Sequence, residues 1–291
     1  MKESMSRKAF LVFNNLILAL LVVVCIYPML YVLFASFSDP IKLMSNNRFI
    51  LAPLGFQTEG YRLVFNNDRI ILGYLNTIII CIGSIVYGVG LTILGAYFFS
   101  RKDVMHQRVL MLFVIFSMFF GGGIIPTFLL YKDIGLTDNL LSVIIAGSVS
   151  TTNLIIMRTA FLSLPGELED AAKIDGTGHI TYLIKIVIPL SMATISVIIL
   201  YVLVGQWNSW FNASIFLQDK KLHPLQLVLR EILVLNQTGA MDAAAKDAEK
   251  ELISETIKYA VIVVATVPIL CIYPFIQKYF VKGVMIGAVK G

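Results

Sequence analysis

The sequence predicts an all-α integral membrane protein with six transmembrane helices. Hydrophobic residues make up 58% of its 291 residues and charged residues only 14%, whereas soluble domains carry roughly 25% charged residues. The mean hydropathy is +0.83. Uncharged runs are long enough to cross the hydrocarbon core of a bilayer, which takes roughly 20 helical residues. A single membrane domain, residues 1–291, therefore accounts for nearly the whole chain.

These apolar runs place the spans. They lie near residues 9–37, 70–100, 109–131, 139–157, 186–205 and 259–277. No small-x-small cleavage site follows the first run, so we expect a retained helix and not a removed signal peptide. The amide and aromatic side chains after residue 205 are typical of a re-entrant or interfacial segment. Gly121–Gly123 predict a break or kink in the third span.

Four small residues of the second span predict close helix packing. Ser84, Gly88, Thr92 and Ala96 recur at every fourth position and form a ridge along one face of the helix. Small side chains let another backbone approach closely in a membrane. The partner can be another helix of this chain or a second membrane subunit.

The positions of Lys and Arg indicate the orientation. Basic residues precede the first span, and others occupy the short loop at 101–108 on the same side. Short loops rich in Lys and Arg favour the cytoplasm. We therefore expect both termini and the loop 162–185 in the cytoplasm, and segments 38–69 and 206–256 outside it. On this interpretation the net charge of +5 reflects topology and not nucleic-acid binding.

Several classes of function lack the residues that they need. The six predicted spans contain no Asp, Glu, Lys, Arg or His, although ion-driven transport generally uses an ionisable group inside the membrane. His106, His179 and His223 are scattered over loops without metal-ligand spacing, so we expect surface residues and no metal site. No catalytic constellation is present, so the chain is not expected to be an enzyme. The P-loop pattern Gly-x4-Gly-Lys-Ser/Thr does not occur; active transport would take its energy from another polypeptide.

Residues 165–190 form a charged loop between two apolar spans. Pro165 suits the start of a short helix, the acidic residues that follow favour its N-terminal end, and Gly176 predicts its end. Ala171 and Ala172 keep one side slim, so that a partner surface can approach. A second short helix leads to Pro189. The residues alone are also compatible with an ordinary amphipathic loop at the membrane surface.

The spacing within this loop resembles a known family. Asp170-Ala171-Ala172, then Gly176 and, after twelve further residues, Pro189 resemble the coupling loop of permease subunits in binding-protein-dependent ABC importers. The family pattern begins with Glu, whereas this chain has Asp170 with Glu169 beside it. The run from residue 273 to residue 291 resembles the ending of an oligosaccharide-transporting branch that is similar to the maltose-importer permeases.

The resemblance implies a fold, a location and partners. The fold would be that of a type I ABC importer permease in a bacterial cell membrane. The partners would be a second homologous permease, a dimeric ATPase that uses ATP and Mg²⁺, and an extracellular solute-binding protein that delivers an oligosaccharide; this chain itself would bind no cofactor. The residues implied for ATPase coupling are Glu169, Asp170, Ala171, Ala172, Asp175, Gly176 and Pro189. A C-terminal tail reaching the ATPase would comprise Gly287, Ala288, Val289, Lys290 and Gly291.

A sugar pathway needs polar groups and rings, because sugar hydroxyls form hydrogen bonds and sugar C–H faces stack on aromatic side chains. The candidates are Tyr74, Asn76, Asn153, Gln206, Trp207, Asn208 and Trp210. Each has an alternative role as an interfacial anchor or an interhelical hydrogen-bond partner. Two other functions also remain open: a permease of similar fold for a non-sugar solute, and a membrane scaffold or receptor component without transport.

Overall fold

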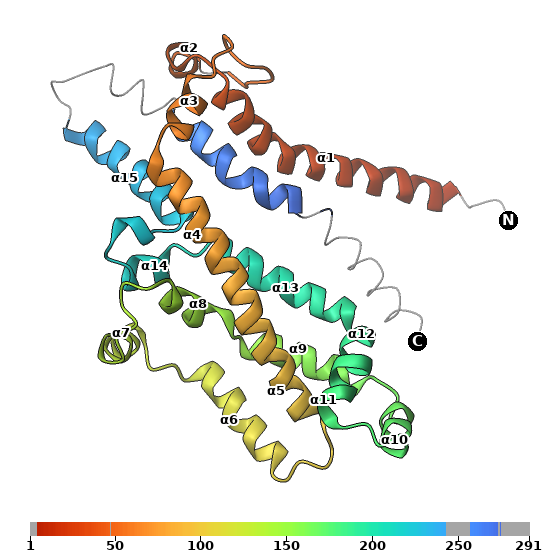
Figure 1. The fold of residues 1–291 in the computed structure, drawn as a ribbon. Coiled ribbons are helices and arrows are strands. Elements are labelled where there is room, and N and C mark those ends of the chain that lie inside the picture. Colours follow the sequence, from red (N-terminus) through yellow and green to blue (C-terminus); the bar gives the residue numbers. More distant parts are fainter. Residues whose placement is uncertain (1–4, 47, 243–256, 273, 275–291) are drawn as a thin grey trace. The chain divides into compact units, whose positions relative to one another are not determined.

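The structure is a computed structural model that describes residues 5–46, 48–242, 257–272 and 274. The chain divides into two units, one of residues 1–68 and 231–267, the other of residues 69–230 and 268–291. Throughout the described residues the regular elements are helices, apart from one isolated bridge between Ser38 and Phe56. The helices are drawn in Figure 1.

The first unit contains a long apolar helix, two short helices and part of a second apolar helix. Its elements are α1 (Met5–Ser36), α2 (Pro40–Met44) and α3 (Glu59–Phe65), together with most of a helix at Ile257–Ile272. The Asp39 carboxylate caps α2 by accepting a hydrogen bond from the backbone N–H of Ile41 at 2.9 Å. Ala35 at the end of α1 and Leu43 in α2 belong to one small core, and the Tyr259 ring packs against it.

The second unit is built around one long helix. This helix runs from Asp68 to Ser100 and consists of α4 (Asp68–Ser84), a π-helical turn η1 (Ile85–Val89) and α5 (Gly90–Ser100). The next elements are α6 (Gln107–Phe119), α7 (Ile124–Asp133), α8 (Leu140–Ser148), α9 (Thr151–Leu162), α10 (Glu167–Ile174), α11 (His179–Tyr182), η2 (Leu183–Val187), α12 (Ile188–Leu190), α13 (Met192–Trp207), α14 (Phe211–Phe216) and η3 (Lys220–Leu222). α15 (Leu225–Asp242) starts in this unit.

Apolar helices lie where the six spans are predicted. By length and composition, Phe10–Ser36 and Asp68–Ser100 can each cross a membrane as one helix. Three bent pairs can form broken spans: Gln107–Phe119 with Ile124–Asp133 (109°), Leu140–Ser148 with Thr151–Leu162 (54°), and His179–Leu190 with Met192–Trp207 (84°). Ile257–Ile272 is a shorter apolar helix. The predicted break at Gly121–Gly123 coincides with the 109° bend, where Gly123 has a φ of +83° that favours glycine.

The ridge of small residues packs inside the chain. Ser84, Thr92 and Ala96 are at most 1% exposed. A Cβ added to Gly88 would lie 2.2 Å from the backbone oxygen of Ser148, the last residue of α8. The long helix and the end of α8 therefore meet backbone to backbone, and the second-subunit alternative is not needed to explain the ridge.

Candidate functional site

The loop between α9 and α13 forms the helix–turn–helix that the sequence predicts. Its first helix, α10, carries its acidic residues in the first turn. Gly176 has a φ of +68°, a region that side chains with a Cβ rarely adopt. The Gly176 N–H donates to the Lys173 carbonyl at 3.0 Å and the Thr177 N–H to the Ala172 carbonyl at 2.9 Å. This pair of bonds is a Schellman motif, so Gly176 ends α10 and reverses the chain toward α11.

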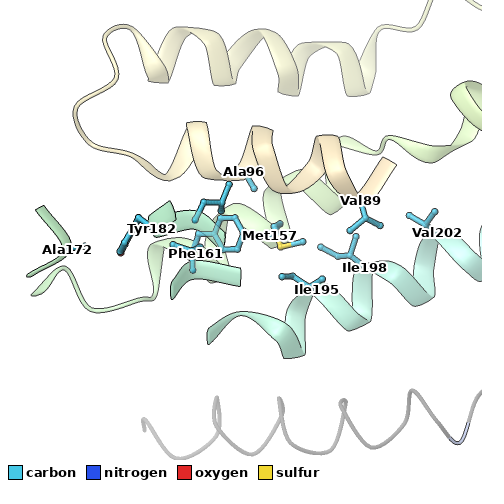
Figure 2. Packing of buried hydrophobic residues seen from close by; sticks show 11 residues of the cluster. Val89, Ala96, Met157, Phe161, Ala172, Tyr182, Ile195, Ile198 and Val202 are labelled. Carbon is cyan, nitrogen blue, oxygen red and sulfur yellow. The ribbon is translucent and has the colours of Figure 1, made fainter. Parts of the chain in front are cut away.

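The inner side of the loop is part of the hydrophobic core of the second unit. Ala172 (6% exposed) and Tyr182 (8% exposed) belong to the same cluster as Met157 of α9 and Ile198 of α13, and Figure 2 shows this row of side chains under α5. The Ala172 side chain therefore lies against helices of this chain, and its role in ATPase coupling stays a prediction. This small side chain lets α10 approach this chain's own helices, while Ala171 is exposed.

Arg101 connects the end of α5 with the loop. Its guanidinium donates to the Tyr97 hydroxyl at 3.0 Å and to His179 Nδ1 at 2.7 Å. It also binds both carboxylate oxygens of Asp103, at 2.8 and 2.5 Å, and lies 3.4 Å from the Glu169 carboxylate. Because arginine only donates, His179 accepts at Nδ1 and carries its proton on Nε2. Arg101 is 9% exposed, so these partners replace most of its water.

The same network sets the charges around the loop. The Arg101 guanidinium holds the pKa of the Asp103 carboxyl below its usual range. The pKa of Lys173 is raised by its hydrogen bond to Glu169, whose carboxylate lies 3.0 Å from the ammonium. Glu169 therefore turns toward two cations of this chain, although the sequence predicts it as a contact for a partner. Both shifts favour the charged forms at neutral pH.

The outer side of the loop exposes apolar residues among charges. Ile174 is 87% exposed and Ile180 is 74% exposed, and Asp170, Ala171 and Asp175 are exposed beside Ile174. Ile174 and Ile180 are thus exposed apolar side chains in an otherwise charged loop. Sequence reasoning missed both isoleucines; the available signal was an apolar side chain at the turn of an otherwise charged loop.

Pro189 lies where the loop joins the fifth predicted span. Proline has no N–H for the helix ladder, and its ring crowds the carbonyl of the residue four positions earlier, here Lys185. The π-helical turn η2 immediately precedes it, and the helix then bends by 84° at Ser191. Pro189 therefore lies at the bend between the loop and α13.

A cavity of about 260 Å³ opens between α5, α9 and α10. Cationic and anionic side chains both line it, including Arg101, Asp103, Asp170 and Lys173. Such a balanced lining favours no single ligand charge.

The residues predicted for a sugar pathway fall into two groups. Asn76, Asn153, Gln206 and Trp207 are buried, at 3 to 8% exposure. Tyr74 is half-buried with its ring 6.2 Å from that of Trp207, Trp210 is half-buried, and Asn208 is exposed. Only the side chains of the second group are exposed enough to contact a solute in this structure.

Asn76 has a structural role. Its Nδ2 donates to the carbonyls of Lys221 at 2.7 Å and His223 at 3.2 Å. Thr77 Oγ1 beside it accepts from the Leu225 N–H at 2.9 Å. The two side chains thus hold the segment before α15 against α4. The prediction that His223 lies on the surface is wrong. His223 is 6% exposed, and its backbone carbonyl accepts a hydrogen bond from Asn76 of α4.

The C-terminal tail at 287–291 lies outside the described residues. The part of the chain that the structure does describe is an all-helical membrane protein with a helix–turn–helix loop joined to its core. Residues 88–286 match the family described as "Binding-protein-dependent transport system inner membrane component", and the chain belongs to that family. It is thus an inner-membrane component of a transport system that depends on a binding protein.

Similar proteins span almost the whole chain. The polygalacturonan/rhamnogalacturonan transport system permease protein YtcP of Bacillus subtilis (strain 168) is 38% identical over 274 residues, covering 94% of this chain and 96% of that protein. Protein LplC of the same organism is 36% identical over 293 residues, covering 100% and 98%. A chain in the crystal structure of a bacterial ABC transporter involved in import of the acidic polysaccharide alginate superposes with a TM-score of 0.85 at 28% identity, covering 96% of this chain and 99% of that chain. The predicted type I importer permease fold is confirmed.

Proposed function

We propose that this chain is one of two membrane subunits of an ATP-driven importer of oligosaccharides, the fragments of larger polysaccharides or glycans. The observation that carries the proposal is the helix–turn–helix loop. Its inner side packs in the hydrophobic core of the second unit, whereas Ile174 and Ile180 are exposed on its outer side. The names of its relatives support a sugar polymer as the source of the solute.

The outer side of the loop would dock a separate ATPase in the cytoplasm. Ile174 and Ile180 supply apolar anchors, and Asp170, Ala171 and Asp175 surround the first of them. Ala172 and the pair Glu169–Arg101 act on the other side, where they fix α10 to the spans. Movement of the ATPase would reach α13 through this rigid connection. ATP and Mg²⁺ belong to the ATPase, and this chain supplies no catalytic group.

The loop in the cytoplasm sets the rest of the topology. Both termini would be cytoplasmic and the segments at 38–69 and 206–256 extracytoplasmic, where a solute-binding protein delivers the oligosaccharide. A second homologous permease would complete the pathway. Tyr74, Asn208 and Trp210 are the pathway candidates with exposed surface, and the tail at 287–291 is proposed to touch the ATPase.

The test is co-purification from native membranes with an affinity-tagged chain. Gly176→Asp places a Cβ at a φ of +68° and adds a charge at the turn, so it should remove the ATPase and leave the second permease. Gly178→Asp is the matched control. Gly178 is the N-cap of α11 with an ordinary φ of −71°, and Asp is favoured at that position.

Recovery of an ATPase, a second permease and a binding protein with the wild-type chain, followed by ATP-dependent oligosaccharide uptake in vesicles, would support the proposal. Absence of any ATPase from the wild-type preparation would contradict it. An assembled complex without solute flux would favour a scaffold, and flux of a non-sugar solute alone would favour a different permease.

A further inference from the structure

An arginine is stacked on a tryptophan at the end of the second unit that is remote from the candidate loop. The Cζ atom of Arg230 lies 3.6 Å from the centroid of the Trp210 ring. Arg230 is exposed and Trp210 is half-buried. Stacking occupies the face of the guanidinium and leaves the N–H donors at its edges, the geometry with which arginine binds a carboxylate through two bonds.

One hydrophobic core fixes both members of this stack. Trp210 packs against a cluster that includes Ile80 of α4, Val143 of α8 and Leu227 of α15. Leu227 precedes Arg230 by three residues on α15, so both lie on neighbouring turns of the same face. The arginine is therefore held before any ligand arrives, which lowers the entropy lost on binding.

The loop before α15 adds two more cations. Lys220 and Lys221 of η3 are exposed. The Asp138 carboxylate accepts from the backbone N–H groups of Gln218 at 2.5 Å and Asp219 at 2.9 Å, and the Asp219 carboxylate caps the Lys221 N–H at 2.9 Å. Both carboxylates thus accept hydrogen bonds from backbone amides and, among the residues that the structure describes, form no ion pair with these lysines.

Arg230, Lys220 and Lys221 carry charges that are available to a ligand. Within the described parts of the chain, neither Arg230 nor Lys220 nor Lys221 forms an ion pair with a carboxylate. An anionic group from outside would therefore meet cations that no acid of the described chain neutralises.

The long helix separates this cluster from the ATPase-facing loop. Asn76 binds the loop that carries Lys221, and Arg101 follows the end of the same helix. From Asn76 to Ser100 the helix rises about 36 Å at 1.5 Å per residue, which exceeds the hydrocarbon core of about 30 Å. The stack therefore lies on the side opposite the ATPase, where solute arrives.

We propose that Arg230, held on Trp210 and assisted by Lys220 and Lys221, binds the carboxylates of uronic-acid sugars, so that this subunit selects acidic over neutral oligosaccharides. The proposal rests on the function proposed above and names the substrate class. The guanidinium edge would bind a carboxylate through two charge-assisted hydrogen bonds, and the lysines would attract the neighbouring carboxylates of the same oligomer.

The test uses the fluorescence of Trp210. The chain contains two tryptophans, so the full-length Trp207→Phe chain in phosphatidylcholine vesicles reports on Trp210 alone. Trigalacturonate should give a saturable change in emission, and a neutral galactose trisaccharide should bind at least about tenfold more weakly. Arg230→Gln should weaken trigalacturonate binding about tenfold or more, as expected for loss of charge-assisted hydrogen bonds, and should abolish the preference for the acidic sugar.

Two further variants complete the series. Arg230→Lys keeps the charge and loses the planar fork, so its affinity should be intermediate. Lys132→Gln removes an exposed cation at the same end of the unit, beside Tyr131, whose ring is 4.7 Å from that of Phe216 of α14. Its affinity should stay within about twofold of that of the parent chain if the stack, and not general charge, binds the sugar.

Equal affinity for the two sugars, or equal losses in Arg230→Gln and Lys132→Gln, would overturn the proposal. Weaker capture of the binding protein by Arg230→Gln with unchanged trigalacturonate affinity would assign the stack to protein docking and would also overturn it. ATP-driven uptake of neutral oligosaccharides with no effect of Arg230→Gln would refute this inference alone, whereas absence of an ATPase partner would refute the proposed function.

Discussion

Replacing Arg101 by Met should loosen the loop at 165–190 without unfolding the membrane helices. The change keeps an apolar stem and removes the bonds to Tyr97 and His179, at 3.0 and 2.7 Å. Hydrogen bonds to a charged group contribute about 1.5–3 kcal/mol each. The pairs with Asp103 (59% exposed) and Glu169 (33% exposed) add at most about 1 kcal/mol each. Because Tyr97 is half-buried and His179 is exposed, we count each of the two hydrogen bonds at about 1–1.5 kcal/mol and the exposed ion pairs at about zero, which gives a net local loss of about 2–3 kcal/mol.

Hydrogen exchange measures this loss directly. Amides of residues 167–182 in the purified full chain should exchange roughly 30- to 150-fold faster in Arg101→Met, since 1.36 kcal/mol corresponds to tenfold and exchange reports local opening. Lys102→Met is the matched control, because Lys102 is exposed and surface changes stay within about 0.5 kcal/mol. Equal exchange in the two variants, or faster exchange along α4 as well, would refute the reasoning.

The pH dependence of this difference follows from Asp103. Its pKa lies below the ordinary value of 3.8 because the Arg101 guanidinium binds the carboxylate. A depressed pKa stabilises the folded loop above the unfolded pKa and loses that effect as pH falls through the folded pKa. The contribution of Asp103 to the difference between wild type and Arg101→Met should therefore be fully present above about pH 3.8 and should shrink at lower pH. An undiminished difference in acid would exclude Asp103 from the network.

Two further changes test the packing around the long helix through the thermal unfolding midpoint of the full chain. Gly88→Ala puts a Cβ 2.2 Å from the Ser148 backbone oxygen and should cost about 1–3 kcal/mol. Gly90→Ala meets nothing within 4 Å and has helical dihedrals, so it should stabilise by about 0.5–1 kcal/mol. Equal midpoints for the two variants would contradict the close approach at Gly88. Asn76→Ala leaves two carbonyls without their donor and should cost about 2–4 kcal/mol, whereas an unchanged midpoint would mean that water replaces the amide.

The sequence predicts those features that depend on local chemistry. Gly176 was identifiable as the end of α10, because a glycine after a short acidic helix favours a left-handed residue. The break at Gly121–Gly123 was identifiable because consecutive glycines weaken a helix and favour a kink. The direction of Ala172 was not, because the phase of an eight-residue helix depends on the core against which it packs.

Contacts between distant residues were beyond sequence reasoning. Arg101 and His179 are 78 positions apart, and each reads alone as a loop charge. Arg230 lies over Trp210 only because α14 and α15 share one core. Charge patterns predict which side of the membrane each loop favours, but not which charged side chain binds which ring or carboxylate.

The 84° bend at Ser191 joins two helical arms, one from the loop and one from the fifth span, at a single elbow. The arm His179–Leu190 is about 18 Å long and the arm Met192–Trp207 about 24 Å at 1.5 Å per residue. A push of about 3 Å at the loop, if the elbow stays rigid, turns both arms by about 10° and carries Trp207 about 4 Å. A small stroke at right angles to the first arm thereby becomes a larger displacement at the far end of the second arm.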